Sequence, residues 1–223
     1  MKKNIALLVL VFTAVFLSGC HHGFMSQVSG SGNRQKQQRD VGAFTSISTE
    51  GAFHIEVVAQ QGLSLEIEGD DNVLPLVSTE VSGNVLHLKS SKSYSTSQPV
   101  IVKIGVPNLE GLTVNGAGKA TVTGLKNDHF SLELNGAPYV IVSGETKLVD
   151  IDASGAGTID TYKLRAARAV VDSKGVSKVD VYASEQLDVT VSGPSTVSYA
   201  GSPIVIKHIN GPGSVQKRQS TGA

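Results

Sequence analysis

The sequence has few of the residues that build disulfide-linked or aromatic-rich sites. The 223-residue chain contains one cysteine, no tryptophan and 5% aromatic residues. A single cysteine excludes an intramolecular disulfide, so side-chain packing must hold the fold together. The formal net charge is zero. This balance argues against a nucleic-acid-binding protein, because such binding requires an excess of Lys and Arg.

The chain also lacks, at its start, a hydrophobic run long enough to span a bilayer. Residues 5–17 are apolar except for Thr13, and Lys2 and Lys3 precede them. A membrane-spanning helix needs about 20 apolar residues, whereas the h-region of a signal peptide has the length seen here. We therefore predict that residues 1–19 are a secretory signal.

The end of this run resembles the lipobox of bacterial lipoproteins. Leu17, Ser18 and Gly19 are an aliphatic and two small residues that precede Cys20. The thiol of Cys20 is the nucleophile that would take up diacylglycerol, and the small residues would let the peptidase approach. An ordinary secretory signal with a chance cysteine is the alternative. We expect Cys20 to become the N-terminus and to hold the protein at the membrane through several acyl chains, palmitate among them.

Residues 20–38 lack apolar periodicity and are rich in Ser, Gly and Gln, which predicts a flexible tether. His21 follows Cys20. In lipoproteins of Gram-negative bacteria, Asp at this place tends to mean retention in the inner membrane, so the resemblance favours the outer membrane. Removal of Lys2 and Lys3 leaves 17 basic and 19 acidic residues, a net charge of −2.

Glycine-centred motifs recur along the body of the chain. Their central residues are Gly116, Gly136, Gly155, Gly175, Gly193 and Gly211, at steps of 18 to 20 residues, and an earlier copy is centred on Gly51. Apolar residues alternate with polar ones before and after each glycine. This period of two is typical of strands with one buried face.

The repeat predicts an all-β fold, a parallel β-helix with coils of 18–20 residues. No helix-length amphipathic segment separates the units, so βαβ crossovers are excluded. Equivalent residues of stacked coils should form columns with a spacing of about 4.8 Å. The turns should need positive φ, and Asn115 and Asn135 should share side-chain hydrogen bonds. Lys207 and Lys217 interrupt the apolar columns, as expected of a terminal coil that faces water.

Residues 58–108 form a strand-rich insertion near the N-terminus of the solenoid. They contain strand-like runs at 63–67, 85–88 and 100–104, and a polar loop at 89–99. The segment from Asp71 to Val81 is predicted to be a short helix with Asp71 as the N-cap and Pro75 in the first turn.

Several segments in order resemble the bacterial "putative auto-transporter adhesin, head GIN domain" family. These are residues 44–47 (FTSI), 51–57 (GAFHIEV), 65–74 (LEIEGDDNVL), 85–88 (VLHL) and 114–118 (VNGAG). The resemblance covers roughly residues 40–215. It implies a right-handed β-helix in the cell envelope and brings no active-site residues with it. We expect the domain to span residues 39–217 and a disordered tail to occupy 218–223.

Carboxylates at equivalent positions are the candidate chemical groups. Asp152 and Asp172 lie three residues before their glycines, and Asp160 and Asp180 lie five residues after theirs. Stacked coils would bring such acids within about 5–10 Å, a spacing that suits a Ca²⁺ site or a pair of glycosidase carboxylates. These four acids are weak metal candidates. A solvated strand face is the simpler interpretation, with nearby basic residues to offset the charge: Lys163, Arg165, Arg168, Lys174 and Lys178.

Tyr162 and Tyr182 both lie seven residues after a glycine and should stack on one outer face. Two tyrosines without tryptophan make a poor sugar platform, so an ordinary aromatic ladder is the simpler interpretation. No phosphate-binding loop, zinc-ligand spacing or serine-hydrolase motif is found.

The sequence therefore favours a non-catalytic, lipid-anchored protein of the cell envelope without a cofactor, which presents a β-helical surface for binding or adhesion. The expected partners are the membrane, through the lipid on Cys20, and an envelope protein or glycan. Two alternatives stay open: a polysaccharide-active enzyme on the same scaffold, and a structural protein that self-associates as a homo-oligomer.

Overall fold

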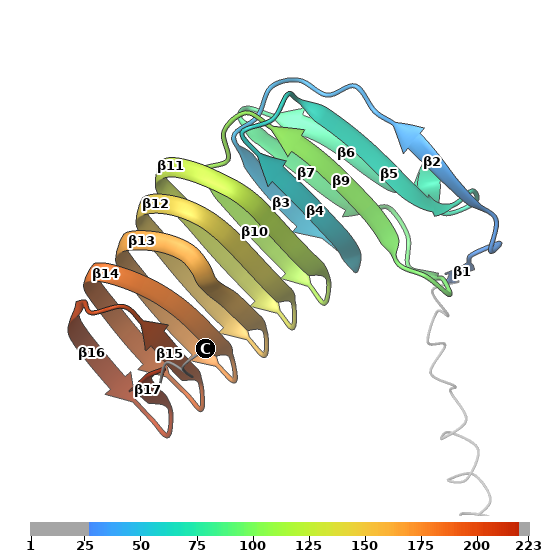
Figure 1. Ribbon diagram of the computed structural model, residues 1–223. Coiled ribbons are helices and arrows are strands. Elements are labelled where there is room, and N and C mark those ends of the chain that lie inside the picture. Colours follow the sequence, from blue (N-terminus) through green and yellow to red (C-terminus); the bar gives the residue numbers. More distant parts are fainter. Residues whose placement is uncertain (1–26, 219–223) are drawn as a thin grey trace, which may run out of the picture.

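The computed structural model describes residues 27–218, and these form a β-solenoid of about five turns (Figure 1). The predicted all-β parallel β-helix is confirmed. The strands are β1 (Val28–Ser29), β2 (Arg34–Gln38), β3 (Ser46–Glu50), β4 (Phe53–Ala59), β5 (Ser64–Asp70), β6 (Val77–Ser82), β7 (Val85–Ser90), β8 (Tyr94–Ser95), β9 (Val100–Val106), β10 (Gly111–Gly116), β11 (Lys119–Gly136), β12 (Tyr139–Gly155), β13 (Thr158–Gly175), β14 (Lys178–Ser192), β15 (Thr196–Ala200), β16 (Ile204–Asn210) and β17 (Ser214–Lys217).

Each coil contributes one strand segment to each of two faces. The first face holds the segments that precede the glycine turns, and the second face holds those that follow them. Strands β11 to β14 are 15 to 18 residues long because each begins on the second face, bends at a corner and continues on the first. We call the stacked bends at residues 123–128, 143–147, 162–167 and 182–185 the corner edge.

The predicted columns of apolar residues are present. On the second face, Val140 aligns with Ile159, which aligns with Val179, which aligns with Val197. All four side chains are fully buried. On the first face an equivalent column runs through Leu112, Leu132, Ile151, Val171 and Val189. β-Branched and leucine side chains of neighbouring coils therefore pack in register, and one coil alone could not bury them.

The glycine turns have the positive φ that the sequence predicts. Gly116 has a φ of 126° and Gly136 a φ of 108°. A Cβ atom on Gly136 would lie 2.5 Å from the carbonyl oxygen of Gly116, so the stacked turns also approach too closely for a side chain. The expected asparagine contact is confirmed, because Nδ2 of Asn135 donates to Oδ1 of Asn115 over 2.9 Å.

The segment 58–108 extends the solenoid. Strand β9 pairs in parallel with β4, and β7 pairs in parallel with β3, so each face gains one more strand. Strands β5 and β6 then pair antiparallel with β9 and β7 and form the outer strands of that end, together with β2. The core continues without a break into this end of the molecule.

The helix predicted over residues 71–81 is wrong. Only Leu74–Leu76 form a single 3₁₀ turn, which is capped by Val73 and contains Pro75. Residues 77–82 form β6, because their alternating side chains match a strand that pairs with β7. Asp71 caps no helix, since its carboxylate accepts hydrogen bonds from the side chains of Ser31 and Asn33.

The expected tether is also corrected in part. Residues 34–38 form β2, which pairs antiparallel with β5 from Arg34–Asp70 to Gln38–Glu66. An edge strand can form through backbone hydrogen bonds without alternating apolar residues, so the composition of this segment gave no sign of β2. Residues 1–26 and 219–223 lie outside the described part of the chain, and with them the predicted signal, Cys20 and most of the predicted tail. Within residues 27–218, no helix is long and apolar enough to cross a membrane.

In the last coil, two lysines interrupt the apolar columns, as predicted. Lys207 aligns with Val189, and Lys217 aligns with Tyr199. Both lysines are exposed, at the end of the solenoid where β16 and β17 have a strand neighbour on one side only. Charged side chains at interior positions of such an edge oppose pairing with another chain.

Candidate binding site

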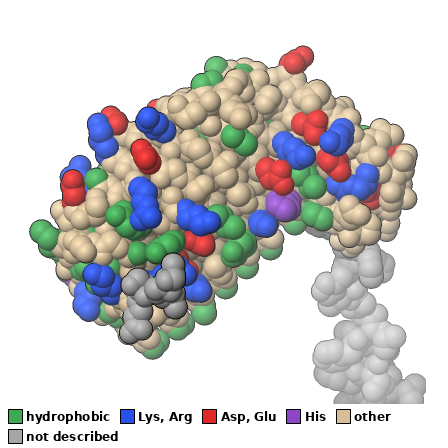
Figure 2. Space-filling view, viewed as in Figure 1, with side chains coloured by type: hydrophobic (Ala, Val, Ile, Leu, Met, Phe, Trp, Pro, Cys, Tyr) green, Lys and Arg blue, Asp and Glu red, His purple; other side chains and the backbone are tan. Residues whose placement is uncertain are grey.

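A groove follows the corner edge across the coils of β11 to β14. It is open, has a volume of about 640 Å³, and is lined by segments of all four strands. The charged and aromatic side chains that line it are Lys126, Asp128, Glu145, Lys147, Arg165 and Tyr182. Along the upper-left side of the coils, where these bends lie in Figure 1, charged side chains of both signs project (Figure 2).

The groove lies where the coils become shorter. Between the aligned pairs Thr161–Val181 and Arg168–Gln186, strand β13 has two more residues than β14. The step between successive turn glycines falls accordingly from 20 residues, before Gly175, to 18 after it. The longer bend of β13 carries Arg165, and the shorter bend of β14 carries Tyr182.

The charges of the groove are arranged in register. Lys126 aligns with Glu145, which aligns with Arg165. The guanidinium of Arg165 lies 4.3 Å from the centre of the Tyr182 ring, a cation–π contact that orients both groups. Nearby, Lys147 and Asp128 form an exposed ion pair of 2.9 Å.

The four acids singled out in the sequence do not form one site. Asp152 and Asp172 align on the first face, whereas Asp160 and Asp180 align on the second. Nζ of Lys174 lies 2.9 Å from Asp172 and 3.9 Å from Asp152. The hydrogen bond that Lys174 donates to Asp172, together with the charges of both acids, raises the pKa of Lys174.

A shallow depression of about 370 Å³ lies on the first face beside these acids. Glu133, Asp150 and Asp152 line it, and Asp150 contacts Nε2 of His129 over 2.7 Å. On the second face, Lys178 lies 3.7 Å from Asp180. Within residues 27–218, no group of three or more His, Cys, Asp or Glu is placed to hold a metal ion. Asp152 is exposed, whereas Asp160, Asp172 and Asp180 are partly buried. Lys174 lies beside Asp152 and Asp172, and Lys178 lies beside Asp180.

The two tyrosines of the corner edge pack against arginines. Tyr162 and Tyr182 follow the last aligned pair before the register shift, so they do not continue the ladder as an aligned pair. The guanidinium of Arg218 lies 4.6 Å from the ring centre of Tyr162, as Arg165 does over Tyr182 at 4.3 Å. Equal spacing from the glycines suggested stacking of the rings, but the unequal coil lengths prevent alignment.

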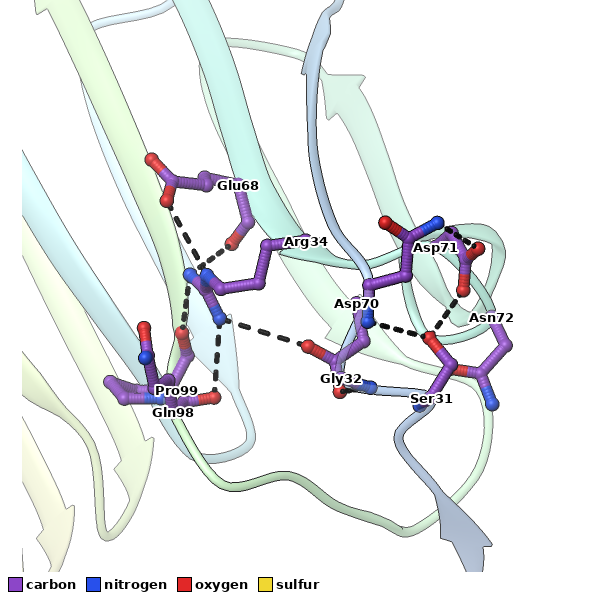
Figure 3. Close-up of polar contacts among 10 residues, drawn as sticks. Ser31, Gly32, Arg34, Glu68, Asp70, Asp71, Asn72, Gln98 and Pro99 are labelled. Carbon is purple, nitrogen blue, oxygen red and sulfur yellow. Dashed lines mark hydrogen bonds and ion pairs between the residues drawn. The ribbon is translucent and has the colours of Figure 1, made fainter.

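A polar cluster that the sequence did not reveal fastens residues 31–34 to the body of the solenoid. Figure 3 shows Arg34 among Glu68, Asp70 and the carbonyls of Gln98 and Pro99. Arg34 lies 3.4 Å from the Glu68 carboxylate and 3.9 Å from that of Asp70, whose side chain is only 2% exposed. Burial of a carboxylate requires such a partner, so the cluster is a structural clamp.

The second half of the clamp is a hydrogen-bonded loop. The backbone N–H of Gly32 donates to Asp70 over 3.1 Å, and the side chains of Ser31 and Asn33 donate to Asp71. These side-chain hydrogen bonds stabilise the charged carboxylate and hold the pKa of Asp71 below its usual value. The contacts join residues about 40 positions apart, which is why local sequence patterns gave no sign of them.

Comparison with known proteins identifies the group to which this fold belongs. The family model for the "putative auto-transporter adhesin, head GIN domain" matches residues 43–203. No curated protein matches the chain. A solved "putative adhesin" from Bacteroides fragilis has 23% identity and a TM-score of 0.67, over 86% of this chain and all of its own.

Two further solved structures share the fold. A "putative lipid binding protein" from Parabacteroides distasonis has 18% identity and a TM-score of 0.57, over 87% of this chain and all of its own. A "putative adhesin" from Parabacteroides merdae has 17% identity and a TM-score of 0.56, over 86% of this chain and 99% of its own. The chain therefore belongs to the adhesin-like head GIN domain family.

Proposed function

We propose that the protein is a non-catalytic, lipid-anchored component of the bacterial envelope, in the outer membrane, that binds an extended ligand in the groove of its corner edge. The groove is the observation that carries this proposal. It crosses four coils and combines exposed charges with an oriented arginine–tyrosine pair. Such a surface suits recognition of a chain-like molecule, which meets a new set of side chains at every coil.

The position of the groove supports a protein that is held to the membrane at one end and binds its ligand away from that end. The described chain begins beside β1 at one end of the solenoid, and strands β4, β5 and β9 lie between that end and the coils of β11 to β14 that carry the groove (Figure 1). A lipid on Cys20 would thus hold the molecule by the end that carries the clamp of Arg34. The groove would stay free for a partner in the envelope.

The carboxylates favour binding over catalysis. A glycosidase needs two carboxyl groups that flank the scissile bond, with one pKa raised. Here Asp152 and Asp172 share Lys174, and Asp150 contacts His129, all on strands of the exposed first face. The groove itself has Asp128 already paired with Lys147.

Anchoring is tested with the full chain expressed in a bacterial host. We expect the wild type to incorporate an alkyne analogue of palmitate and to sediment with membranes, and Cys20→Ala to lose both properties. Inhibition of the lipoprotein signal peptidase should make the precursor accumulate. Incorporation of the label by Cys20→Ala would overturn the proposed anchor.

Binding is tested with the lipidated protein in nanodiscs on a glycan array, together with a screen for hydrolysis of the bound glycans. We expect binding without cleavage. Tyr182→Ala should weaken the binding, and Tyr139→Ala, which removes an exposed tyrosine outside the groove, should not. Cleavage of a bound glycan, or equal binding by the two variants, would contradict this function.

A further inference from the structure

The corner edge carries more basic than acidic side chains. Its basic residues are Lys126, Lys147, Lys163 and Arg165, and its acidic residues are Asp128, Glu145 and Glu185. Within residues 27–218, Lys147 and Asp128 are the only ones among these seven that form an ion pair. Three cations then face two carboxylates, on a domain whose 17 basic and 19 acidic residues give it a net negative charge.

Arg165 is oriented to bind an oxyanion. Its guanidinium stacks on Tyr182 at 4.3 Å, and a stacked guanidinium keeps its N–H groups free at the rim of the plane. Arginine binds carboxylate and sulfate through two parallel hydrogen bonds, and a guanidinium already held in place loses little conformational entropy when it does so. The pair thus provides an ordered cation at the wall of the groove.

A second cation lies further along the same column. Lys126 is two coils away from Arg165, which places their backbones roughly 10 Å apart along the solenoid axis. Glu145 lies between them. This spacing lets one chain present separate anionic groups to the two cations, while Glu145 accepts hydrogen bonds from hydroxyl groups between them.

The shape of the site favours a chain over a flat surface. The cations line a groove that crosses four coils, so a slender polymer along the axis reaches several of them at once, whereas a planar layer of lipid headgroups contacts only the rims. The first face cannot serve the same ligand, because Glu133, Asp150, Asp152 and Asp172 gather there.

We propose that the corner groove binds an anionic polysaccharide, with its acidic groups on Arg165 and Lys126 and its sugar chain along the solenoid axis. This inference rests on the proposed function and specifies its ligand class. The shared chemistry is a repeated oxyanion, either the carboxylate of a uronic acid or a sulfate ester.

The test uses full-length lipidated protein in neutral phosphatidylcholine nanodiscs. The probes are polygalacturonate, dextran sulfate and uncharged dextran, and the readout is the dissociation constant by biolayer interferometry. We expect one or both anionic polymers to bind at least tenfold more tightly than dextran, with affinity falling as salt rises. Comparison of the two anionic probes distinguishes carboxylate from sulfate.

Substitutions then locate the site. Arg165→Ala and Lys126→Ala should each weaken binding of the anionic polymer roughly tenfold. Arg165→Lys should weaken it less than Arg165→Ala does, because lysine keeps the charge but not the planar group that stacks on Tyr182. Glu145→Gln should strengthen the binding, because it removes a repulsive charge. Lys92→Ala is the matched control, since Lys92 is an exposed lysine outside the groove. Unchanged thermal unfolding of each variant would show that the fold is intact.

Four outcomes overturn the inference. Equal affinity for dextran and the anionic polymers, with sensitivity to Tyr182→Ala, would refute the ligand class and leave the proposed binding function standing. Failure of both anionic polymers to bind, or equal effects of Lys126→Ala and Lys92→Ala, would refute the groove as an anion site. Binding to phosphatidylglycerol vesicles without binding to either polymer would identify the edge as a membrane contact.

Discussion

Asn135 donates a side-chain hydrogen bond from Nδ2 to Oδ1 of Asn115, one coil away, over 2.9 Å. The two residues occupy the same place before consecutive glycine turns and are aligned backbone neighbours. Asn135 also donates to Glu133 over 3.1 Å. The contact shows that one repeat of the sequence corresponds to one coil of the solenoid.

Asn135→Ala should lower the free energy of unfolding by about 1 kcal/mol, because it removes the hydrogen bonds to Asn115 and Glu133. Urea denaturation followed by circular dichroism measures this change. Ser154→Ala is the matched control, since Ser154 holds the next position in the ladder and makes only a 3.5 Å contact with Asp152. An equal loss in both variants would contradict a specific asparagine contact.

Gly136→Ala should destabilise the fold by about 2 kcal/mol or more, because its φ of 108° is unfavourable for a residue with a Cβ atom. The added methyl group would also lie 2.5 Å from the carbonyl oxygen of Gly116. Gly83→Asn provides the comparison, since Gly83 has a φ of 61° and open space around its Cα. The thermal midpoints should fall for Gly136→Ala and stay nearly constant for Gly83→Asn.

Arg34→Ala should cost about 3 kcal/mol, because it leaves the buried carboxylate of Asp70 without its cation. Lys36→Ala should cost under about 1 kcal/mol, since the Lys36 side chain is 58% exposed in its contacts with Glu66 and Glu68. Chemical denaturation of both variants tests this difference. The double variant Arg34→Ala with Asp70→Asn should recover part of the loss, and no recovery would argue against the charge as its cause.

Stability should depend on pH through Asp71. The pKa of Asp71 is lowered in the folded state by hydrogen bonds from Ser31 and Asn33, so its contribution is fully present above the unfolded pKa of about 3.9. It is lost as pH falls through the lower folded pKa. The stability difference between wild type and Asp71→Asn should therefore shrink on acidification in that range, as measured by urea titrations at a series of pH values. The double variant Ser31→Ala with Asn33→Ala should lose the same pH dependence of stability, because it removes the hydrogen bonds that lower the pKa of Asp71.

The last coil should resist end-to-end association because of its two lysines. Lys207→Val combined with Lys217→Val should produce larger species in size-exclusion chromatography with light scattering, since it restores apolar columns at the edge strands β16 and β17. Lys178→Val, on an exposed outward position, should leave the mass of the particle unchanged. A double variant of unchanged mass would show that charge at these positions does not control association.

The candidate site could be predicted from the sequence only in pieces. Tyr182 lies at the same distance from Gly175 as Tyr162 from Gly155, and Arg165 is one of the basic residues near the repeated acids. The fall of the repeat from 20 to 18 residues was also visible, but its effect on the corner edge requires the register of β13 against β14. The clamp of Arg34 on Asp70 and Glu68 left no local pattern, because antiparallel pairing of β2 with β5 joins distant segments.

The sequence by itself determined the coil. Alternating apolar residues at a fixed distance from each glycine allow one buried arrangement, in which Val140, Ile159 and Val179 lie above one another, because a single coil cannot cover its own apolar side. Tertiary structure decided what the surface presents. Whether residues 71–81 form a helix or a strand, and whether Arg165 meets Tyr182 in a groove, depends on which segments become neighbours in space, and hydrogen bonds and cation–π contacts between such segments leave no periodicity in the chain.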